Sequence, residues 1–255
     1  MKLGKYRFGT QIFFLILSIY LFVFLILGKY QTAHEFCPYS SVCFGTLSLN
    51  PQFGHFIFKY SIIAGLAIAI LSIILGRKFC GYVCPIGTAQ ELLFKFNKKK
   101  KQYGFMKYLS WIKYPIFVGT VFLSYNALQY YFITFCPVYS LAHPTMIKAA
   151  GIFSLFTIFV VSIFIERFWC RVLCPYAAFM NLIQYLGNLL HIPRFNIKRS
   201  ESQCKSCNIC VKNCPMGIDV VKYSVINNPE CIHCENCIKA CPIDGGLSIK
   251  FGKKK

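Results

Sequence analysis

Eight cysteines near the end of the chain form two copies of one motif, and this motif constrains the fold more than any other feature. Each copy has three cysteines at intervals of three residues and a fourth, followed by proline, four residues later. Three thiolates at that spacing can bind one face of a cubane, while the fourth, turned away by its proline, ligates a second cubane. The sequence therefore predicts two [4Fe–4S] clusters. The copies are Cys204, Cys207, Cys210 and Cys214 before Pro215, and Cys231, Cys234, Cys237 and Cys241 before Pro242.

Because the fourth cysteine of each copy serves the other cluster, each ligand set draws on both copies. Structural zinc and disulfide bonds are the alternatives. Zinc motifs usually present cysteines in two pairs rather than in repeated runs of four, and this favours iron–sulfur clusters. We expect residues 196–255 to form a small α+β ferredoxin-like domain. Cluster 1 is assigned Cys204, Cys207, Cys210 and Cys241, and cluster 2 is assigned Cys231, Cys234, Cys237 and Cys214.

The rest of the chain is strongly apolar, since 56% of all residues are hydrophobic and only 14% are charged. An uncharged helix of about 18 residues rises about 27 Å, close to the roughly 30 Å hydrocarbon core of a bilayer. No small-x-small cleavage site follows the first apolar run, so we interpret it as a retained span and not as a signal peptide. The sequence predicts a mainly α membrane protein. Residues 1–195 would form four transmembrane helices in two repeated hairpins, at about 10–27, 56–75, 114–133 and 149–166.

The chain has 28 Lys and Arg against 8 Asp and Glu, a formal net charge of +20. A nucleic-acid partner is not expected, because the basic residues lie between the apolar runs, as membrane topology requires. The positive-inside rule then places both termini and the 77–113 loop in the cytoplasm, with the protein in the inner (cytoplasmic) cell membrane as a multi-pass protein. We expect the basic runs 98–101 and 253–255 to contact membrane lipid.

The two apolar hairpins repeat one cysteine pattern, with Phe-Cys-Pro at the outer end and Cys-x3-Cys-Pro at the inner end. Repeats of this kind pack around a pseudo-twofold axis, which would bring the four inner cysteines together. Proline suits the first turn of a helix, so new helices should begin at about Ile86 and Tyr176 and lie on the inner membrane surface. The inner cysteines are Cys80 and Cys84 before Pro85, and Cys170 and Cys174 before Pro175.

Cys84 and Cys174 would then lie at helix N-termini beside Arg77 and Arg167, and both features lower the pKa of a thiol. Two interpretations of the inner cysteines are open. They form a metal or redox site close to a bound quinone, or they are reduced thiols that pack against the ferredoxin domain.

The outer cysteines predict a disulfide bond, because the outer side faces an oxidising compartment. Cys37 would pair with Cys136 across the pseudo-symmetry axis or with the nearby Cys43, and the sequence leaves both pairings open.

Four spans, two Cys-x3-Cys-Pro motifs and a C-terminal two-cluster domain resemble the ferredoxin-type quinol dehydrogenases of the NapH family over nearly the whole chain. The nitrous-oxide reductase accessory polyferredoxin and the cytochrome-oxidase assembly ferredoxin are similar more loosely. The resemblance implies electron transfer between the quinone/quinol pool and a redox partner of ferredoxin or cytochrome type. The outer Phe-Cys-Pro loops depart from the nitrate-reductase members, so no nitrate partner is assigned. The residues that the resemblance implies as functional are the eight cluster cysteines and Cys80, Cys84, Cys170 and Cys174.

Two other functions fit the same residues. A metal-ion (copper) reductase or metalloenzyme assembly factor would use the four inner cysteines as metal ligands, and a non-catalytic membrane anchor would only dock a redox complex. No side chain other than a cysteine is given a role in the chemistry.

Overall fold

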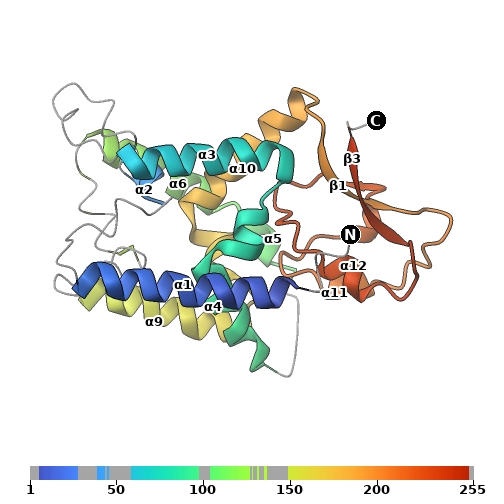
Figure 1. Ribbon diagram of the computed structural model, residues 1–255, viewed down its shortest axis with the longest axis horizontal. Helices are drawn as coiled ribbons and strands as arrows, with labels where there is room; N and C mark the ends of the chain where they lie inside the picture. Colours follow the sequence, from blue (N-terminus) through green and yellow to red (C-terminus); the bar gives the residue numbers. More distant parts are fainter. Residues whose placement is uncertain are drawn as a thin grey trace.

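The computed structural model describes residues 6–27, 39–43, 45, 59–97, 104–126, 128, 131, 135–136 and 149–252. Helices occupy one end of the molecule, and a small sheet with the cysteine motifs occupies the other (Figure 1). The helical part contains α1 (Arg7–Leu27), α2 (Ser40–Cys43), α3 (Lys59–Leu75), α4 (Pro85–Lys95), α5 (Met106–Leu109), α6 (Lys113–Tyr125), α9 (Ala149–Phe164) and α10 (Pro175–Leu189). Two one-turn π-helices, η4 (Phe79–Val83) and η6 (Trp169–Leu173), precede α4 and α10.

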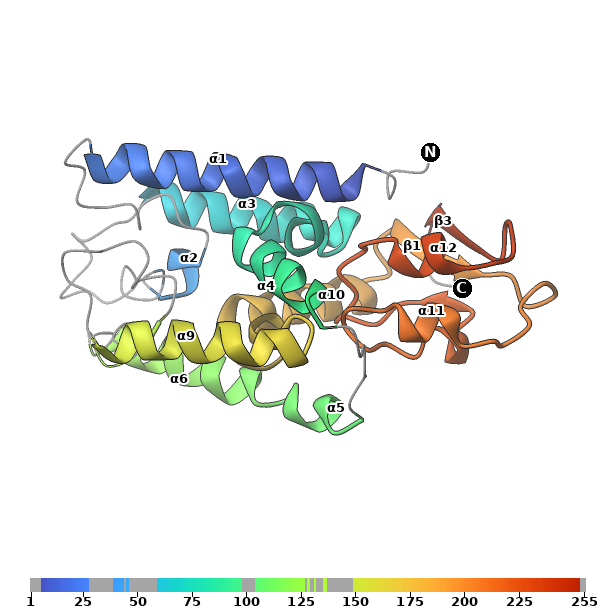
Figure 2. The ribbon, with the colours of Figure 1, turned by 90° about the horizontal axis from the view of Figure 1, so that it is seen from below.

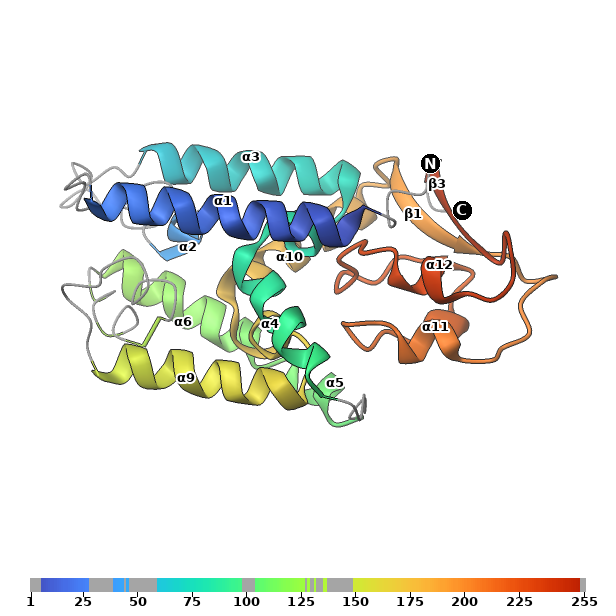
Figure 3. The same cartoon turned by 60° about the horizontal axis from the view of Figure 1, so that its bottom comes forward.

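The helical part consists of two interlocked halves. α1 and α3 run along one side of the molecule and α6 and α9 along the other, with α4 and α10 between them (Figures 2 and 3). α4 follows α3 in the chain but packs against α9 and α1, and α10 follows α9 but packs against α3 and α6. Each short helix therefore contacts the long helix of the opposite repeat, which brings the two Cys-x3-Cys-Pro motifs to the middle of the fold.

The cysteine-rich part is built on a three-stranded antiparallel sheet of β1 (Arg194–Arg199), β2 (Val225–Ile226) and β3 (Leu247–Gly252), in the order β2-β1-β3. Ile197 of β1 lies opposite both Ile226 and Ile249, and it is 1% exposed because the short helices cover this face. These helices are α11 (Ile209–Lys212), η7 (Val220–Lys222) and α12 (Asn236–Ala240).

The predicted transmembrane fold is wrong. Within the residues that the structure describes, no helix is both long enough and apolar enough to cross a membrane. α3, α6 and α9 have 17, 13 and 16 residues, fewer than the roughly 20 that span a bilayer. α1 has 21 residues, but its first turns carry buried Arg7 and Gln11, which hydrogen-bond inside the protein.

This finding overturns the predicted spans at 10–27, 56–75, 114–133 and 149–166, and with them the multi-pass location in the inner membrane. The described chain is mainly helical with a small three-stranded sheet.

The helix after each Cys-x3-Cys-Pro motif begins where the sequence predicts, since α4 and α10 start at Pro85 and Pro175. Their expected position on a membrane surface is wrong. α4 buries Ile86, Gln90 and Phe94, and α10 is also largely covered, because both helices fill the space between the long helices.

Candidate cluster sites

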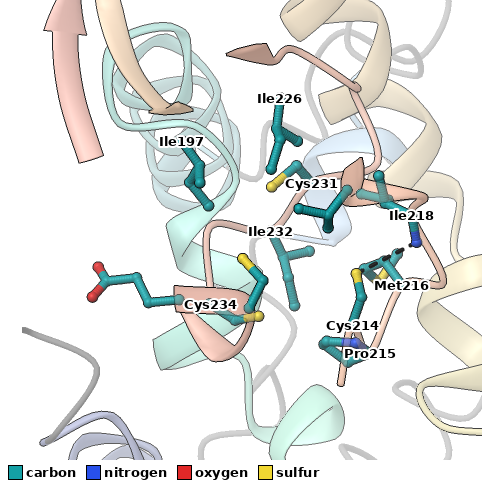
Figure 4. A pocket seen from close by; sticks show the side chains of 12 residues that line it. Ile197, Cys214, Pro215, Met216, Ile218, Ile226, Cys231, Ile232 and Cys234 are labelled. Atoms are coloured by element: carbon teal, nitrogen blue, oxygen red, sulfur yellow. Dashed lines mark hydrogen bonds between the residues drawn. The ribbon is translucent and has the colours of Figure 1, made fainter. Parts of the chain in front are cut away.

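Four of the eight motif cysteines line one cavity of the cysteine-rich part (Figure 4). Apolar side chains surround them, among them Ile197 and Ile232, each 1% exposed. Burial raises the pKa of Cys214 to about 11 and that of Cys234 to about 12. Thiols in such surroundings ionise when a bound cation compensates the thiolate charge. We call this cavity the inner site; its cysteines are Cys214, Cys231, Cys234 and Cys237.

The other four cysteines line a second cavity, the outer site, together with Arg199 and Lys205. Cys207 is exposed, whereas Cys210 is buried. The outer site therefore has an edge that opens to solvent beside two basic side chains. Its cysteines are Cys204, Cys207, Cys210 and Cys241.

The chain wraps around both sites in the same way. The residues on either side of the second cysteine of each motif have left-handed backbone conformations, with φ between 49° and 61°. This conformation turns successive backbone N–H groups toward one side and forms a concave anion-binding nest. The backbone N–H of Ile218 donates to Cys214 Sγ at 3.4 Å, and the N–H of Ser206 contributes most to lowering the pKa of Cys204. The four residues are Ser206, Asn208, His233 and Glu235.

The donor sets fit [4Fe–4S] clusters. Each site offers four thiols and backbone amides aimed at sulfur, which is the ligand chemistry of such clusters. In the described parts of the chain, no three Cys, His, Asp or Glu side chains are arranged to hold a single metal ion. The grouping of the cysteines is that of the two predicted ligand sets, and cluster binding itself stays a prediction.

The cysteines of the two Cys-x3-Cys-Pro motifs lie together in the helical part. Between 2% and 7% of each is exposed, and charge on at least one of the others contributes to each of the three raised pKa values. We call them the four-thiol site: Cys80, Cys84, Cys170 and Cys174.

Two π-helices and two helix caps position these thiols. The backbone N–H of Cys84 donates to the carbonyl of Phe79 at 3.0 Å, and that of Cys174 to Trp169 at 2.9 Å, five residues back in each case. Single π-turns of this kind often occur at functional sites. Cys84 and Cys174 are the N-caps of α4 and α10, and the sulfur of Cys84 accepts from the N–H of Gly87 at 3.4 Å.

The expected lowering of the thiol pKa is wrong. Burial raises the pKa of Cys84 and Cys174 and raises that of Cys170 to about 12, because desolvation outweighs the helix N-terminus and the neighbouring arginines. In the absence of a bound cation these thiols are therefore protonated at neutral pH.

Two polar side chains at this site were not found from the sequence. Tyr39 Oη lies 2.8 Å from Cys84 Sγ, and the Tyr39 side chain is 8% exposed. Gln90 joins the two halves, because its Oε1 accepts from the Trp169 N–H at 2.9 Å while its Nε2 lies 3.8 Å from Cys170 Sγ. No local pattern marks either residue, since both act on cysteines far away in the sequence.

The four-thiol site lies directly beside the inner site. Cys80 packs in one apolar cluster with Ile232 and Cys234. Gly81 makes this approach possible, because a Cβ atom there would meet the carbonyl oxygen of Ile232 at 2.6 Å. In the second Cys-x3-Cys-Pro motif, the Arg171 guanidinium lies against Gly217. Burial lowers the pKa of Arg171, and the charge of nearby Cys214 offsets part of this effect.

Two buried ionic networks join the helices to the cysteine-rich part. Glu91 accepts from Arg7 at 2.5 Å and from Arg167 at 2.7 Å. Arg7 also donates to Asn236 of α12 at 2.7 Å. Burial raises the pKa of Glu91, but Arg167 and Arg7 outweigh this effect and lower it to about 2.

Glu230 forms the second network, in which Lys113 and Arg77 both pair with its carboxylate. Asn181 of α10 completes it by donating to Glu230 at 2.8 Å and accepting from Arg77 at 2.5 Å. Arg77, Lys113 and Arg167 are each 0% exposed, so the two carboxylates hold buried cations in place.

A large cavity lies between α6, α9 and η6. Its volume is about 910 Å³, and its lining is almost entirely apolar, with Phe153, Phe168 and Leu173 among the lining residues. Trp169 lines the same cavity and is 6% exposed. Among the residues that the structure describes, its indole Nε1–H has no hydrogen-bond partner. Trp169 precedes Cys170, so the cavity adjoins the four-thiol site.

The disulfide bond predicted at the outer ends of the two hairpins lies only partly within the described residues. Cys136 is buried and lines the large cavity. Cys37 and the side chain of Cys43 are not among the described residues, so both pairings stay predictions.

Comparison with known families gives two matches. A 4Fe-4S dicluster domain matches residues 196–242, and a 4Fe-4S binding domain matches residues 60–102 and 148–193. The chain carries 4Fe–4S ferredoxin-type domains. The match to the 4Fe-4S binding domain includes both Cys-x3-Cys-Pro motifs and leaves out the segment between its two parts.

Several known proteins are similar to this chain. Protein YccM of Escherichia coli (strain K12) is 26% identical over 88% of this chain and 69% of its own length. Protein NirI of Paracoccus denitrificans is 32% identical over 59% of this chain and 23% of its own length. The methylamine utilization ferredoxin-type protein MauN of Methylobacillus flagellatus is 27% identical over 55% of this chain and 48% of its own length.

These matches support an iron–sulfur electron-transfer family. They do not show that the chain belongs to the NapH family specifically. The chain spans about a quarter to about two thirds of the length of these three relatives. No solved structure matches the chain.

Proposed function

We propose that this protein transfers electrons between a quinone and a redox partner protein, in the manner of the NapH-type quinol dehydrogenases. The ferredoxin-type domains and the ferredoxin-type relative MauN support electron transfer. The observation that carries the quinone is the large apolar cavity between α6, α9 and η6, whose lining includes Trp169, with a buried indole N–H that has no hydrogen-bond partner among the described residues.

The cavity has the chemistry that a quinone needs. Its volume is close to the upper end of the roughly 300–1,000 Å³ range of small-molecule sites, and apolar walls with few polar groups are typical of such sites. Among the described lining residues, the hydroxyls of Thr120 and Ser154 donate to carbonyls of their own helices. The hydroxyl of Thr157, which also lines the cavity, and the indole N–H of Trp169 are then the side-chain groups left to donate to a quinone carbonyl.

The eight motif cysteines would hold the two clusters, which supply one-electron carriers when bound. Oxidation of a quinol to a quinone releases two electrons and two protons. The inner site lies toward the helical part and its cavity, whereas the exposed Cys207 puts the outer site at the surface. A redox partner would dock at this outer edge, where Arg199 and Lys205 suit an acidic surface.

The chain has two tryptophans, which allows a matched test. Decylubiquinone binding to the cluster-loaded protein is measured by equilibrium dialysis for the wild type, Trp169→Phe and Trp111→Phe. Trp111 is 69% exposed and does not line the cavity, so Trp111→Phe serves as the control. Loss of one hydrogen bond, about 1 kcal/mol, should weaken the Kd of Trp169→Phe about fivefold and leave the control unchanged.

Equal Kd values in all three proteins would refute the quinone site. Should Trp169→Phe fail to fold, the Trp111→Phe protein decides the matter, because Trp169 is then the remaining tryptophan. Saturable quenching of its fluorescence by decylubiquinone is expected, and the absence of quenching counts against the proposal.

A further inference from the structure

We propose that a smaller cavity between α3 and η4 binds a single-chain amphipathic carboxylate, with the ammonium group of Lys78 against the carboxylate. We call it the α3 cavity; its volume is about 290 Å³. The inference goes beyond the proposed function, which concerns the large cavity and the cluster sites. It rests on the internal repeat, on the charge of Lys78 and on the size of the cavity.

The internal repeat builds the α3 cavity from the same positions as the inner end of the large cavity. Equivalent positions of the two repeats are 90 residues apart, as Cys80 and Cys170 are. Three lining residues of the α3 cavity therefore correspond to lining residues of the large cavity, on the opposite side of the molecule (Figure 3). The pairs are Ile68 and Ile158, Phe79 and Trp169, and Val83 and Leu173. The fold thus forms two related apolar cavities, one in each repeat.

A lysine distinguishes the α3 cavity from its counterpart. Lys78 lines the α3 cavity at the position that Phe168 has in the large cavity. Within the part of the chain that the structure describes, no carboxylate pairs with Lys78. Its Nζ lies 5.3 Å from the centre of the Phe195 ring, a cation–π contact that leaves the positive charge uncompensated. A cation without a counter-ion in an apolar wall favours a ligand with a negative head and an apolar body.

The size and charge of the α3 cavity favour one kind of amphipathic anion. Its volume is near the lower end of the roughly 300–1,000 Å³ range of small-molecule sites, which suits one hydrocarbon chain and not the two chains of a phospholipid. The hydroxyl of Ser72, which also lines the cavity, already donates to the Ala69 carbonyl at 2.6 Å. One ammonium group balances one carboxylate, whereas a phosphate monoester carries a charge of about −1.5 to −2.

The α3 cavity borders the inner site. Gly76 lines the cavity, and a Cβ atom at Gly76 would clash with the ring of His233, which lies between Cys231 and Cys234. Phe195, whose ring faces Lys78, also accepts from or faces His233, because its carbonyl oxygen lies 3.1 Å from His233 Nε2. A carboxylate held by Lys78 would therefore place a negative charge close to the loop of the inner site.

Binding of decanoate to the cluster-loaded full chain, measured by equilibrium dialysis, tests the proposal. The proteins are the wild type, Lys78→Met, which keeps an apolar side chain of similar length, and Lys107→Met. Lys107 is exposed and is not a lining residue of the α3 cavity or of the large cavity, so it controls for the loss of one positive charge. We expect saturable binding to the wild type, a Kd about tenfold weaker in Lys78→Met, and no change in Lys107→Met. Decanol, which has no charge, should bind the wild type and Lys78→Met equally.

Equal decanoate Kd values in the two lysine variants, or no saturable binding to the wild type, would overturn the proposal. A decanol Kd that weakens in Lys78→Met as much as the decanoate Kd would also overturn it. Should Lys78→Met fail to fold, two substitutions on the exposed face of α3 replace it. Leu71, 55% exposed, lines the cavity, whereas Ile63, 64% exposed, does not. Leu71→Trp should narrow the cavity and weaken decanoate binding relative to Ile63→Trp, and equal Kd values in this pair would refute the site.

Discussion

The carbonyl oxygen of Ile232 lies 2.6 Å from the point that a Cβ atom would occupy on Gly81. Ile232 belongs to the loop that carries Cys231 and Cys234 of the inner site, and Gly81 lies between Cys80 and Cys84 of the four-thiol site. One missing side chain thus sets how closely the two groups of cysteines approach each other.

Gly81→Ala should push the inner site away from the helical part. A real Cβ atom does not tolerate a backbone oxygen at this distance, so the loop or η4 has to move, at a cost of about 1–3 kcal/mol. Chemical unfolding and the EPR spectrum of the inner cluster would report the change. The control is Gly9→Ala in α1, where no atom of the described residues lies within 4 Å of the added Cβ. That variant should be neutral or stabilised by up to about 1 kcal/mol, and equal behaviour of the two variants would contradict the prediction.

Glu230→Gln should destabilise the protein strongly. The substitution leaves Arg77 and Lys113, both 0% exposed, without their shared carboxylate, and breaking a buried ion pair costs about 3–5 kcal/mol. The matched control is Glu201→Gln, whose carboxylate is 70% exposed and lies 3.9 Å from Arg199. It should change the free energy of unfolding by less than about 0.5 kcal/mol. A loss below about 1 kcal/mol for Glu230→Gln would show that this network is unimportant for stability.

Glu91 should stabilise the fold down to unusually low pH. Its folded-state pKa is lowered to about 2 from an ordinary value of 4.5, so its contribution is complete above pH 4.5 and is lost as the pH falls toward 2. The difference in melting temperature between the wild type and Glu91→Gln should therefore stay constant from neutral pH to about pH 5. A difference that stays unchanged between pH 4.5 and pH 2 would mean that the folded-state pKa of Glu91 is not lowered.

The cluster of the outer site should be the first to degrade in air. Cys207 is exposed, whereas Cys234 and Cys237 of the inner site are each 8% exposed, and solvent access governs how easily oxidants reach a cluster. EPR during timed air exposure should show one centre decaying before the others. Cys207→Ser should lack that early-decaying signal and retain the slow ones, and loss of a slow signal instead would reverse the assignment.

Features set by local spacing could be predicted from the sequence. The intervals within the motif already group the eight cysteines into two sets, because a cubane needs its ligands at fixed separations along the chain. The starts of α4 and α10 follow from the sterics of Pro85 and Pro175. Both features depend mainly on close spacing; the exception is the fourth cysteine of each set, Cys241 or Cys214, which comes from the other copy and follows from the two-cluster ferredoxin pattern.

Features set by distant contacts could not be predicted. Glu91 meets Arg7 across 84 residues, and Lys113 meets Glu230 across 117. Only three acidic residues occur among the first 195, and this scarcity is the one signal that could have marked Glu91. The predicted spans failed because an apolar run does not fix where a helix ends: α6 stops at Tyr125, although the apolar run predicts a helix to about residue 133.

The hydrogen bond from Arg7 to Asn236 joins positions 229 residues apart and so links the two ends of the described chain. On the ribosome, α1 is made before α12 and has to wait for this partner until residue 236 has been synthesised. Loading of the predicted cluster at the inner site would have to come before that partner docks, because Cys234 and Cys237 are each only 8% exposed in the folded chain. The fold therefore predicts an order of maturation in which the cluster is loaded first and the contact between α1 and α12 forms afterwards.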